Sequence, residues 1–404
     1  MDHYRSSKRS SISFGSYQRP SMNFGQNSSS YYTPRQLYSA QQSPQKTQAM
    51  IPCHYEAHFP LFALDWSEDD YVALGSYKED AFNKIQIVHS NDLITWDKVS
   101  EGNVVFPISR VQWCPNGMSQ RLATCSDSLR LWSFSDCTLQ EQLNLSLCRY
   151  NKGTTTSMAT LGQLPPVSSF HWNSIDNNLI ISCSIDTTCT VWDLQSTNYV
   201  KTQLIAHDSE VFDVKFLTQS TQLFASCGGD GSVRVFDLRC LAHSTIIYEP
   251  SAASGVLREN SNSSSHALLR LEPSLYDPNV VATFTQDSNS IIILDMRYPG
   301  SPVLTLEGHI SAVNQIQWHP SRRNVLLSCS DDCQVLYWDL NTWLSSSAVA
   351  STASKWNANN IVHSLDVPQQ AYTDAPYEVN NIVWRPQDDW FGCNMGRQFQ
   401  SVRA

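Results

Sequence analysis

The sequence has few charged residues, and it lacks long apolar runs and an apolar N-terminal segment. Charged side chains make up 16% of the 404 residues, against about a quarter in an average domain. The 12 Trp and 15 Phe supply material for a core, so this composition excludes a chain that is disordered throughout. No apolar run approaches the roughly 20 residues that cross a bilayer, and the N-terminus shows no signal-peptide pattern. We therefore expect a soluble intracellular protein without a membrane partner.

The 12 cysteines lack the CxxC pairs that are typical of zinc sites and redox motifs. They are scattered from Cys53 to Cys393, which excludes a small disulfide-bonded scaffold. We interpret them as buried apolar side chains in a reducing compartment. No His/Cys cluster has metal-ligand spacing, and no phosphate-binding glycine motif occurs. We therefore expect neither a metal nor a cofactor.

The net charge of −10 is unevenly distributed along the chain. Residues 1–50 carry six basic side chains, one acidic side chain and 12 serines, without an apolar period. They are predicted to form a disordered basic tail. The segment Arg5 to Ser11 is compatible with a nuclear import signal or a phosphorylation site, and the alternative is an unmodified, solvated tail. Residues 51–404 hold 21 basic and 36 acidic side chains, a net of −15. That charge repels a phosphate backbone, so we expect basic protein partners and no direct nucleic-acid binding.

A short pattern of alternating apolar residues recurs seven times in residues 51–404 and ends in an aromatic residue or Leu. Its period of two predicts a half-buried strand in each copy. The seven copies end at Trp66, Trp113, Trp172, Phe216, Leu271, Trp318 and Trp384.

A second β-rich pattern follows each copy at a nearly constant distance. In the first six units the two markers are 22, 19, 20, 20, 23 and 20 residues apart, whereas successive first markers are 44 to 66 residues apart. A constant interior with variable joints indicates one repeated structural unit with insertions in its loops. We predict an all-β fold, a seven-bladed β-propeller over residues 51–404. The second markers are Val88, Trp132, Trp192, Phe236, Leu294, Trp338 and, weakly, the segment 399–402.

The seventh unit ends after its third strand, so another segment must supply the fourth. Residues 52–58 lie directly before the first strand of the first unit. We expect these residues to pair with the C-terminal unit and close the ring, because closure removes exposed sheet edges. The Ser-rich joints 251–265 and 345–358 are expected to be loops.

Two units carry the same set of polar residues, with the final aromatic residue 29 positions after the His. A buried Asp that accepts hydrogen bonds from His and from backbone N–H groups would fix a loop to its own strands. A hydrolase triad is the alternative reading, but two copies at one spacing favour a structural role. We therefore expect no catalytic residues and no enzyme activity. The sets are His207, Ser226, Asp230 and Phe236, and His309, Ser328, Asp332 and Trp338.

Several segments resemble the adaptor family that includes plant Transparent Testa Glabra and its animal cullin-4-associated counterpart, which binds dual-specificity tyrosine-regulated kinases. The resemblance lies in SIDTTCTVWDL (Ser184 to Leu194), VKTQLIAHDSEVFDV (Val200 to Val214) and FASCGGDGSVRVFDLRCLAHSTIIYE (Phe224 to Glu249). It extends over nearly all of residues 51–404, and the fungal members of the family are the expected group. It implies a seven-bladed WD40 β-propeller that serves as a non-catalytic scaffold in the cytoplasm and nucleus.

The resemblance also implies partners. A monomeric propeller would bind a protein kinase or transcription factors on its loop-lined faces. The candidate contacts come from the loops beside His207 and His309 and from neighbouring turns, and they are Asp186, Asp208, Glu210, Ile310 and Asp331. The alternative is a substrate receptor of a cullin-4-type ubiquitin ligase, because Arg239 in FDLR and Arg297 in LDMR resemble the WDxR signature that docks such receptors on the ligase adaptor. Of the two readings of these arginines, we favour ordinary exposed or salt-bridged loop residues.

Overall fold

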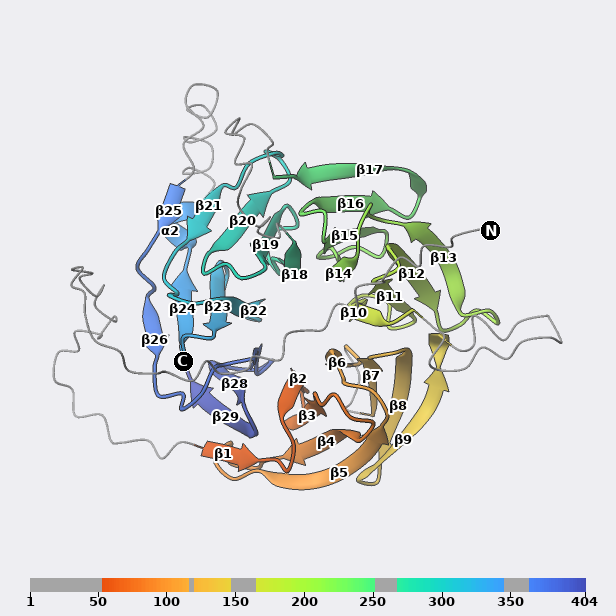
Figure 1. The fold of residues 1–404 in the computed structure, drawn as a ribbon, viewed down its shortest axis with the longest axis vertical. Helices are drawn as coiled ribbons and strands as arrows, with labels where there is room; N and C mark the ends of the chain where they lie inside the picture. The colour runs from red at the N-terminus through yellow and green to blue at the C-terminus, as the bar shows by residue number, and fades with distance from the viewer. Residues whose placement is uncertain (1–52, 116–119, 147–164, 251–266, 345–362) are drawn as a thin grey trace, which may run out of the picture. The chain divides into compact units, whose positions relative to one another are not determined.

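The protein is an all-β, seven-bladed β-propeller. The computed structural model describes residues 53–115, 120–146, 165–250, 267–344 and 363–404, which all belong to one compact unit, Gln42–Ala404. Seven sheets surround a common axis (Figure 1). The predicted tail and the Ser-rich joints lie outside the described residues.

The innermost strand of each blade lines the axis. It follows the alternating pattern read from the sequence, because one set of side chains packs between sheets and the other faces the axis. Each of these strands touches the innermost strands of the two neighbouring blades. The innermost strands are β2 (Leu61–Trp66), β6 (Arg110–Trp113), β10 (Val167–Trp172), β14 (Val211–Phe216), β18 (Leu268–Pro273), β22 (Val313–Trp318) and β27 (Asn381–Trp384).

The second and third strands form the buried middle of each sheet, and most of their side chains are inaccessible to solvent. The second strands are β3 (Tyr71–Ser76), β7 (Arg121–Cys125), β11 (Leu179–Ser184), β15 (Leu223–Gly228), β19 (Val280–Thr285), β23 (Val325–Ser330) and β28 (Trp390–Met395). The third strands are β4 (Asn83–His89), β8 (Leu129–Ser135), β12 (Thr188–Asp193), β16 (Val233–Asp237), β20 (Ile291–Asp295), β24 (Val335–Asp339) and β29 (Gln398–Arg403).

The outermost strands are more polar and more exposed. Blade 1 is β2–β5, and blades 2 to 7 follow in chain order. The outer strands of blades 1 to 7 are β5 (Asp97–Val104), β9 (Thr138–Asn144), β13 (Val200–Ile205), β17 (Cys240–Tyr248), β21 (Leu304–Leu306), β26 (Gln370–Tyr372) and β1 (Cys53–Glu56).

Blade 5 has a fifth strand, which the repeat did not predict. After the short helix α2 (Asn341–Leu344), the chain adds β25 (His363–Leu365) in parallel to β21. It then returns to blade 6 as β26, antiparallel to β24. The long connection between β24 and β26 allows this detour, and β25 covers an edge that β21 would otherwise leave unpaired.

The ring closes by pairing the two ends of the propeller. Residues 52–58 were expected to supply the fourth strand of the last blade, and β1 lies antiparallel to β29, with Cys53 opposite Ser401 and Glu56 opposite Gln398. A side-chain contact adds to this junction, because the indole N–H of Trp96 donates to Ser401 Oγ over 3.0 Å.

Hydrophobic side chains fill the spaces between neighbouring sheets. The described residues form seven buried clusters, and each cluster draws its members from two adjacent blades. The cluster between blades 7 and 1 contains Trp66, Trp96 and Phe399, whose rings meet edge to face at 5.0 to 6.0 Å. Burial between blades therefore couples each sheet to both neighbours.

Two expectations from the sequence are wrong in detail. Leu271 does not end the innermost strand of blade 5, because β18 continues to Pro273, which pairs with Val281 in the register where other blades have an aromatic residue. Proline at the strand end hid the pattern. Not all cysteines are buried: Cys137, in the β8–β9 turn, and Cys240, at the start of β17, are exposed.

The loops of each blade divide between the two ends of the propeller axis. We call one end of the axis the top face. It carries the loops that connect the second strand of a blade to the third, such as 229–232, and the loops that connect one blade to the next, such as 206–210. The bottom face carries the loops from first to second and from third to fourth strands, such as 217–222 and 238–239. No helix among the described residues is long and apolar enough to span a membrane.

Candidate functional site

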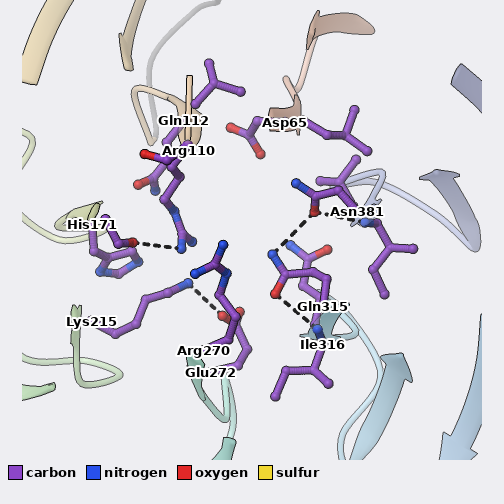
Figure 2. Close-up of a pocket in the computed structure, with 17 residues that line it drawn as sticks. Asp65, Arg110, Gln112, His171, Lys215, Arg270, Glu272, Gln315, Ile316 and Asn381 are labelled. Atoms are coloured by element: carbon purple, nitrogen blue, oxygen red, sulfur yellow. Dashed lines mark hydrogen bonds and ion pairs between the residues drawn. The ribbon is translucent and has the colours of Figure 1, made fainter. Parts of the chain in front are cut away.

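A polar channel runs along the propeller axis. It contains a cavity of about 140 Å³ whose walls come from all seven innermost strands (Figure 2). The polar side chains that line it are Asp65, Ser109, Arg110, Gln112, Ser169, His171, Lys215, Arg270, Glu272, Gln315, Gln317 and Asn381. The channel therefore contains both signs of charge together with neutral amides.

Strand register arranges these side chains in two rows. The upper row, nearer the top face, holds the residues of the innermost strands that pair with second-strand residues such as Cys227 and Phe284. The lower row holds the residues two positions later in each innermost strand. The charged members of the upper row are Arg110, Asp213 and Arg270. The charged members of the lower row are Asp65, Lys215 and Glu272.

Lower-row side chains join one blade to the next. In four blades the residue directly before the terminal aromatic residue accepts a hydrogen bond from the backbone N–H of the aromatic residue in the following blade. Such an N–H group would cost free energy if it were buried without a partner. The acceptors and donors are Asp65 Oδ2 and Trp113 (2.6 Å), Gln112 Oε1 and Trp172 (2.9 Å), His171 Nδ1 and Phe216 (3.1 Å), and Gln317 Oε1 and Trp384 (2.7 Å).

Charged groups replace this contact between blades 4 and 5. Lys215 Nζ lies 2.6 Å from Glu272 Oε2. Asp213 is buried and accepts from Leu271 N–H at 2.9 Å, from Ser169 Oγ at 2.6 Å and from Arg110 Nη1 at 3.4 Å. Burial raises the pKa of Asp213, but Arg110 and Lys215 outweigh this effect and hold it below its usual value.

Two lower-row groups have strongly perturbed pKa values. Burial raises the pKa of Asp65 to about 6, although Trp113 N–H and Arg110 oppose the shift. Burial, with Lys215 and Arg110 nearby, moves the pKa of His171 well below its usual value. His171 is therefore neutral near pH 7, as its acceptor role at Nδ1 requires.

The two His–Ser–Asp sets connect top-face loops to their own blades. His207 Nδ1 lies 2.9 Å from Asp230 Oδ2, and its Nε2 lies 2.7 Å from Ser226 Oγ. Burial raises the pKa of Asp230, but hydrogen bonds from His207 and Ser232 outweigh it and lower that pKa well below its usual value. Phe236 ends this set by stacking on Phe224 at 5.0 Å.

The set in blade 6 has the same geometry and one more link. His309 contacts Asp332 at 2.9 Å and Ser328 at 2.8 Å, and Trp338 Nε1 donates to Ser328 Oγ over 2.9 Å. Ser328 and Ser226 are both fully buried, at 0% exposure. A serine that no substrate reaches cannot act as a nucleophile, so the geometry gives these residues a structural role.

The five candidate contact residues lie on the top face. The side chain of Asp208 is 87% exposed and pairs with Arg234 at 2.9 Å. Ile310 is 64% exposed. Glu210 accepts from Ser209 Oγ. The other two are Asp186, which is exposed and accepts from Thr188, and Asp331, which is half-buried and accepts from Asn314.

Arg239 and Arg297 lie on the opposite, bottom face. Each guanidinium binds the Asp two residues earlier: Arg239 Nη2 lies 2.6 Å from Asp237, and Arg297 Nη2 lies 2.6 Å from Asp295. Arg297 also pairs with Asp277 at 3.1 Å. The structure thus separates the two groups of candidate residues onto two surfaces.

The channel residues were not singled out from the sequence. A signal was present, because a polar residue directly precedes the terminal aromatic residue in LFALDW, SRVQW, SSFHW, FDVKF and NQIQW. In an exposed strand such residues face solvent, and only ring closure turns them toward an enclosed axis. No group of three or more His, Cys, Asp or Glu side chains in the described part of the chain could hold a metal ion.

We expect the contact from Trp113 N–H to Asp65 to contribute measurably to stability. Asp65→Ala should lower the free energy of unfolding by about 1 to 3 kcal/mol, because it leaves a buried N–H without an acceptor. Asp65→Asn keeps an acceptor oxygen and should match or exceed the wild type at pH 7.5. Because the pKa of Asp65 is raised on folding, its ionisation lowers the stability of the wild type as the pH rises from about 4 to about 6. The stability difference between Asp65→Asn and the wild type should therefore become smaller below pH 6.

Urea unfolding at pH 5.0 and 7.5 measures these differences. Asp97→Asn on the exposed strand β5 is the control and should leave stability unchanged at both pH values. An Asp65→Ala variant as stable as the wild type would refute the role of this contact.

Comparison with known proteins agrees with the repeated sheets. The model of the family described as WD domain, G-beta repeat, matches residues 156–193, 198–237 and 300–339. A WD repeat-containing protein of Saccharomyces cerevisiae is 56% identical over 400 residues, covering 87% of this chain and 76% of the relative. The DDB1- and CUL4-associated factor 7 homolog of Dictyostelium discoideum is 36% identical over 360 residues, covering 87% of this chain and 98% of the relative. The chain therefore belongs to the WD-repeat protein family.

Proposed function

We propose that this protein is a non-catalytic scaffold that binds a protein kinase or transcription regulators on its top face, in the cytoplasm and the nucleus. The observation that carries the proposal is the exposed acidic and apolar surface around the loops of blades 4 and 6. Asp208 and Ile310 project from loops whose bases are fixed by buried His–Asp contacts. A rigid base lowers the entropy lost when a partner binds.

The charge of the propeller supports partners with basic segments. Residues 51–404 carry a net charge of −15, and complementary charge increases association rates and excludes acidic competitors. Ile310 adds an exposed apolar side chain on the same face, at blade 6. A basic or amphipathic segment of a partner matches this combination.

Charge reversal tests the top-face proposal. Asp208→Lys combined with Glu210→Lys should reduce recovery of bound kinases or transcription regulators about tenfold, since each lost charge contact costs on the order of 1 kcal/mol. Stability should change by less than about 1 kcal/mol, because Arg234 keeps its contact with Asp230. Affinity purification with quantitative mass spectrometry gives the measurement.

Asp388→Lys on the bottom face is a matched control. Asp388 is exposed and pairs with Arg385, which also holds Asp70, just as Arg234 holds both Asp208 and Asp230. Partner recovery should be unchanged in this variant. The proposed surface would be contradicted if the Asp208→Lys, Glu210→Lys double variant recovered as much partner protein as the wild type.

A second candidate function is that of a substrate receptor of a cullin-4-type ubiquitin ligase. The Dictyostelium relative is named as a DDB1- and CUL4-associated factor homolog, and Arg239 and Arg297 present matching geometry on adjacent blades. In both, the backbone N–H and the guanidinium bind one carboxylate, which holds the side chain in a defined orientation. Preorganised arginines of this kind suit docking on an adaptor protein.

The ligase role predicts loss of the adaptor from a bottom-face variant. Arg239→Ala with Arg297→Ala should reduce co-purification of the ligase adaptor about tenfold or more while top-face partners remain bound. Co-purification from cells that express each variant measures both groups at once. The ligase role would be refuted if the double variant recovered as much adaptor as the wild type, or if the wild type recovered no adaptor. The scaffold function would then stand by itself.

A further inference from the structure

The upper row of the channel carries one positive charge that no carboxylate of the described residues neutralises at close range. Arg110 pairs with Asp213 at 3.4 Å, and in the lower row Lys215 pairs with Glu272 at 2.6 Å. Arg270 has no such partner within 4 Å in the described part of the chain, and Nη1 donates to Leu269 O at 2.9 Å. A guanidinium has five N–H donors, so most of its capacity is unused.

Arg270 points into the cavity rather than toward bulk solvent. In Figure 2 its guanidinium extends into the channel between Lys215 and Gln315. Removing a cation from water without an anion nearby costs several kcal/mol. The surroundings offset part of this cost through Asp213, Glu272 and amide oxygens, but these acceptors already bind other donors.

Other donors lie beside Arg270 in the cavity wall, which also carries the carboxylates of Asp65 and Glu272 in the lower row. Arg110 Nη1 binds Ser169 Oγ and Asp213, and the amide nitrogen of Gln315 lies 3.3 Å from Asn381 Oδ1. The cavity of about 140 Å³ is large enough for a small ion and too small for a nucleotide or a cofactor. A planar or tetrahedral group of oxygens matches the bidentate fork of arginine.

We propose that the channel binds a small oxyanion, a phosphate, sulfate or carboxylate group, with Arg270 as its principal contact and Arg110 beside it. The group is a free ion or the tip of an acidic side chain that a partner inserts from the top face. Arg270 lies in the row nearer that face. The proposal does not depend on which partners bind the loops.

Titration with inorganic phosphate and sulfate tests the site. Isothermal calorimetry and thermal unfolding at constant ionic strength should show saturable, millimolar binding to the wild type. Arg270→Gln should weaken it about tenfold or more, since charge-assisted bidentate contacts are lost. Arg322→Gln, which removes a bottom-face arginine that pairs with Asp389, is the matched control and should bind like the wild type. Binding that is absent, or unchanged in Arg270→Gln, would overturn the proposal.

A second measurement does not depend on the variant folding. Crystals of the wild-type protein soaked in selenate should show an anomalous peak beside Arg270, whereas peaks confined to the outer surface would overturn the site. Competition identifies the source: phosphate that displaces a purified top-face partner indicates an inserted acidic side chain, and phosphate that binds alongside it indicates a free ion. Both results of the competition support the same site.

Discussion

The structure depends on polar contacts that cross from one blade to the next at the propeller axis. A closed ring forces backbone N–H groups of the innermost strands into a place that water reaches poorly, and each such group needs an acceptor. Four blades supply it through the residue before the terminal aromatic residue. The other three junctions use different contacts. Asp213 and Lys215 join blade 4 to blade 5, the Glu272 carbonyl accepts from the indole N–H of Trp318 in blade 6, and the Asn381 side-chain amide donates to Phe62 O in blade 1.

The interior of the propeller stabilises the fold, and the loops of its faces carry the exposed groups. Buried clusters and axial hydrogen bonds fix the positions of the sheets, and the His–Asp contacts fix the bases of two top-face loops. The loops themselves are then free to carry exposed charge and apolar groups at Asp208 and Ile310 without loss of the fold. Such an arrangement suits a rigid platform for partners, because binding requires little reordering of the scaffold.

Much of the fold was predictable because aromatic residues recur at a nearly constant spacing. Trp172 and Trp192, for example, occupy equivalent rows of one sheet. The prediction was wrong at Leu271, where proline replaces the aromatic residue, and it missed β25, which pairs through a contact distant in sequence. The polar residues before the terminal aromatic residues were a local signal for the channel, but Arg270 and Lys215 look like solvated strand residues until seven strands enclose them. The function of exposed top-face residues such as Asp208 has no sequence signature.

Native-state hydrogen exchange of the backbone amides tests the central claim most directly. The amides of Trp113, Trp172, Phe216 and Trp384 bind side chains of a neighbouring blade rather than a paired strand. If these contacts hold the ring together, all four amides should exchange only through global unfolding, as slowly as the central amides of the second and third strands. Fast exchange at any one of them, with protected strands on both sides, would show that the junction opens alone and would contradict the account.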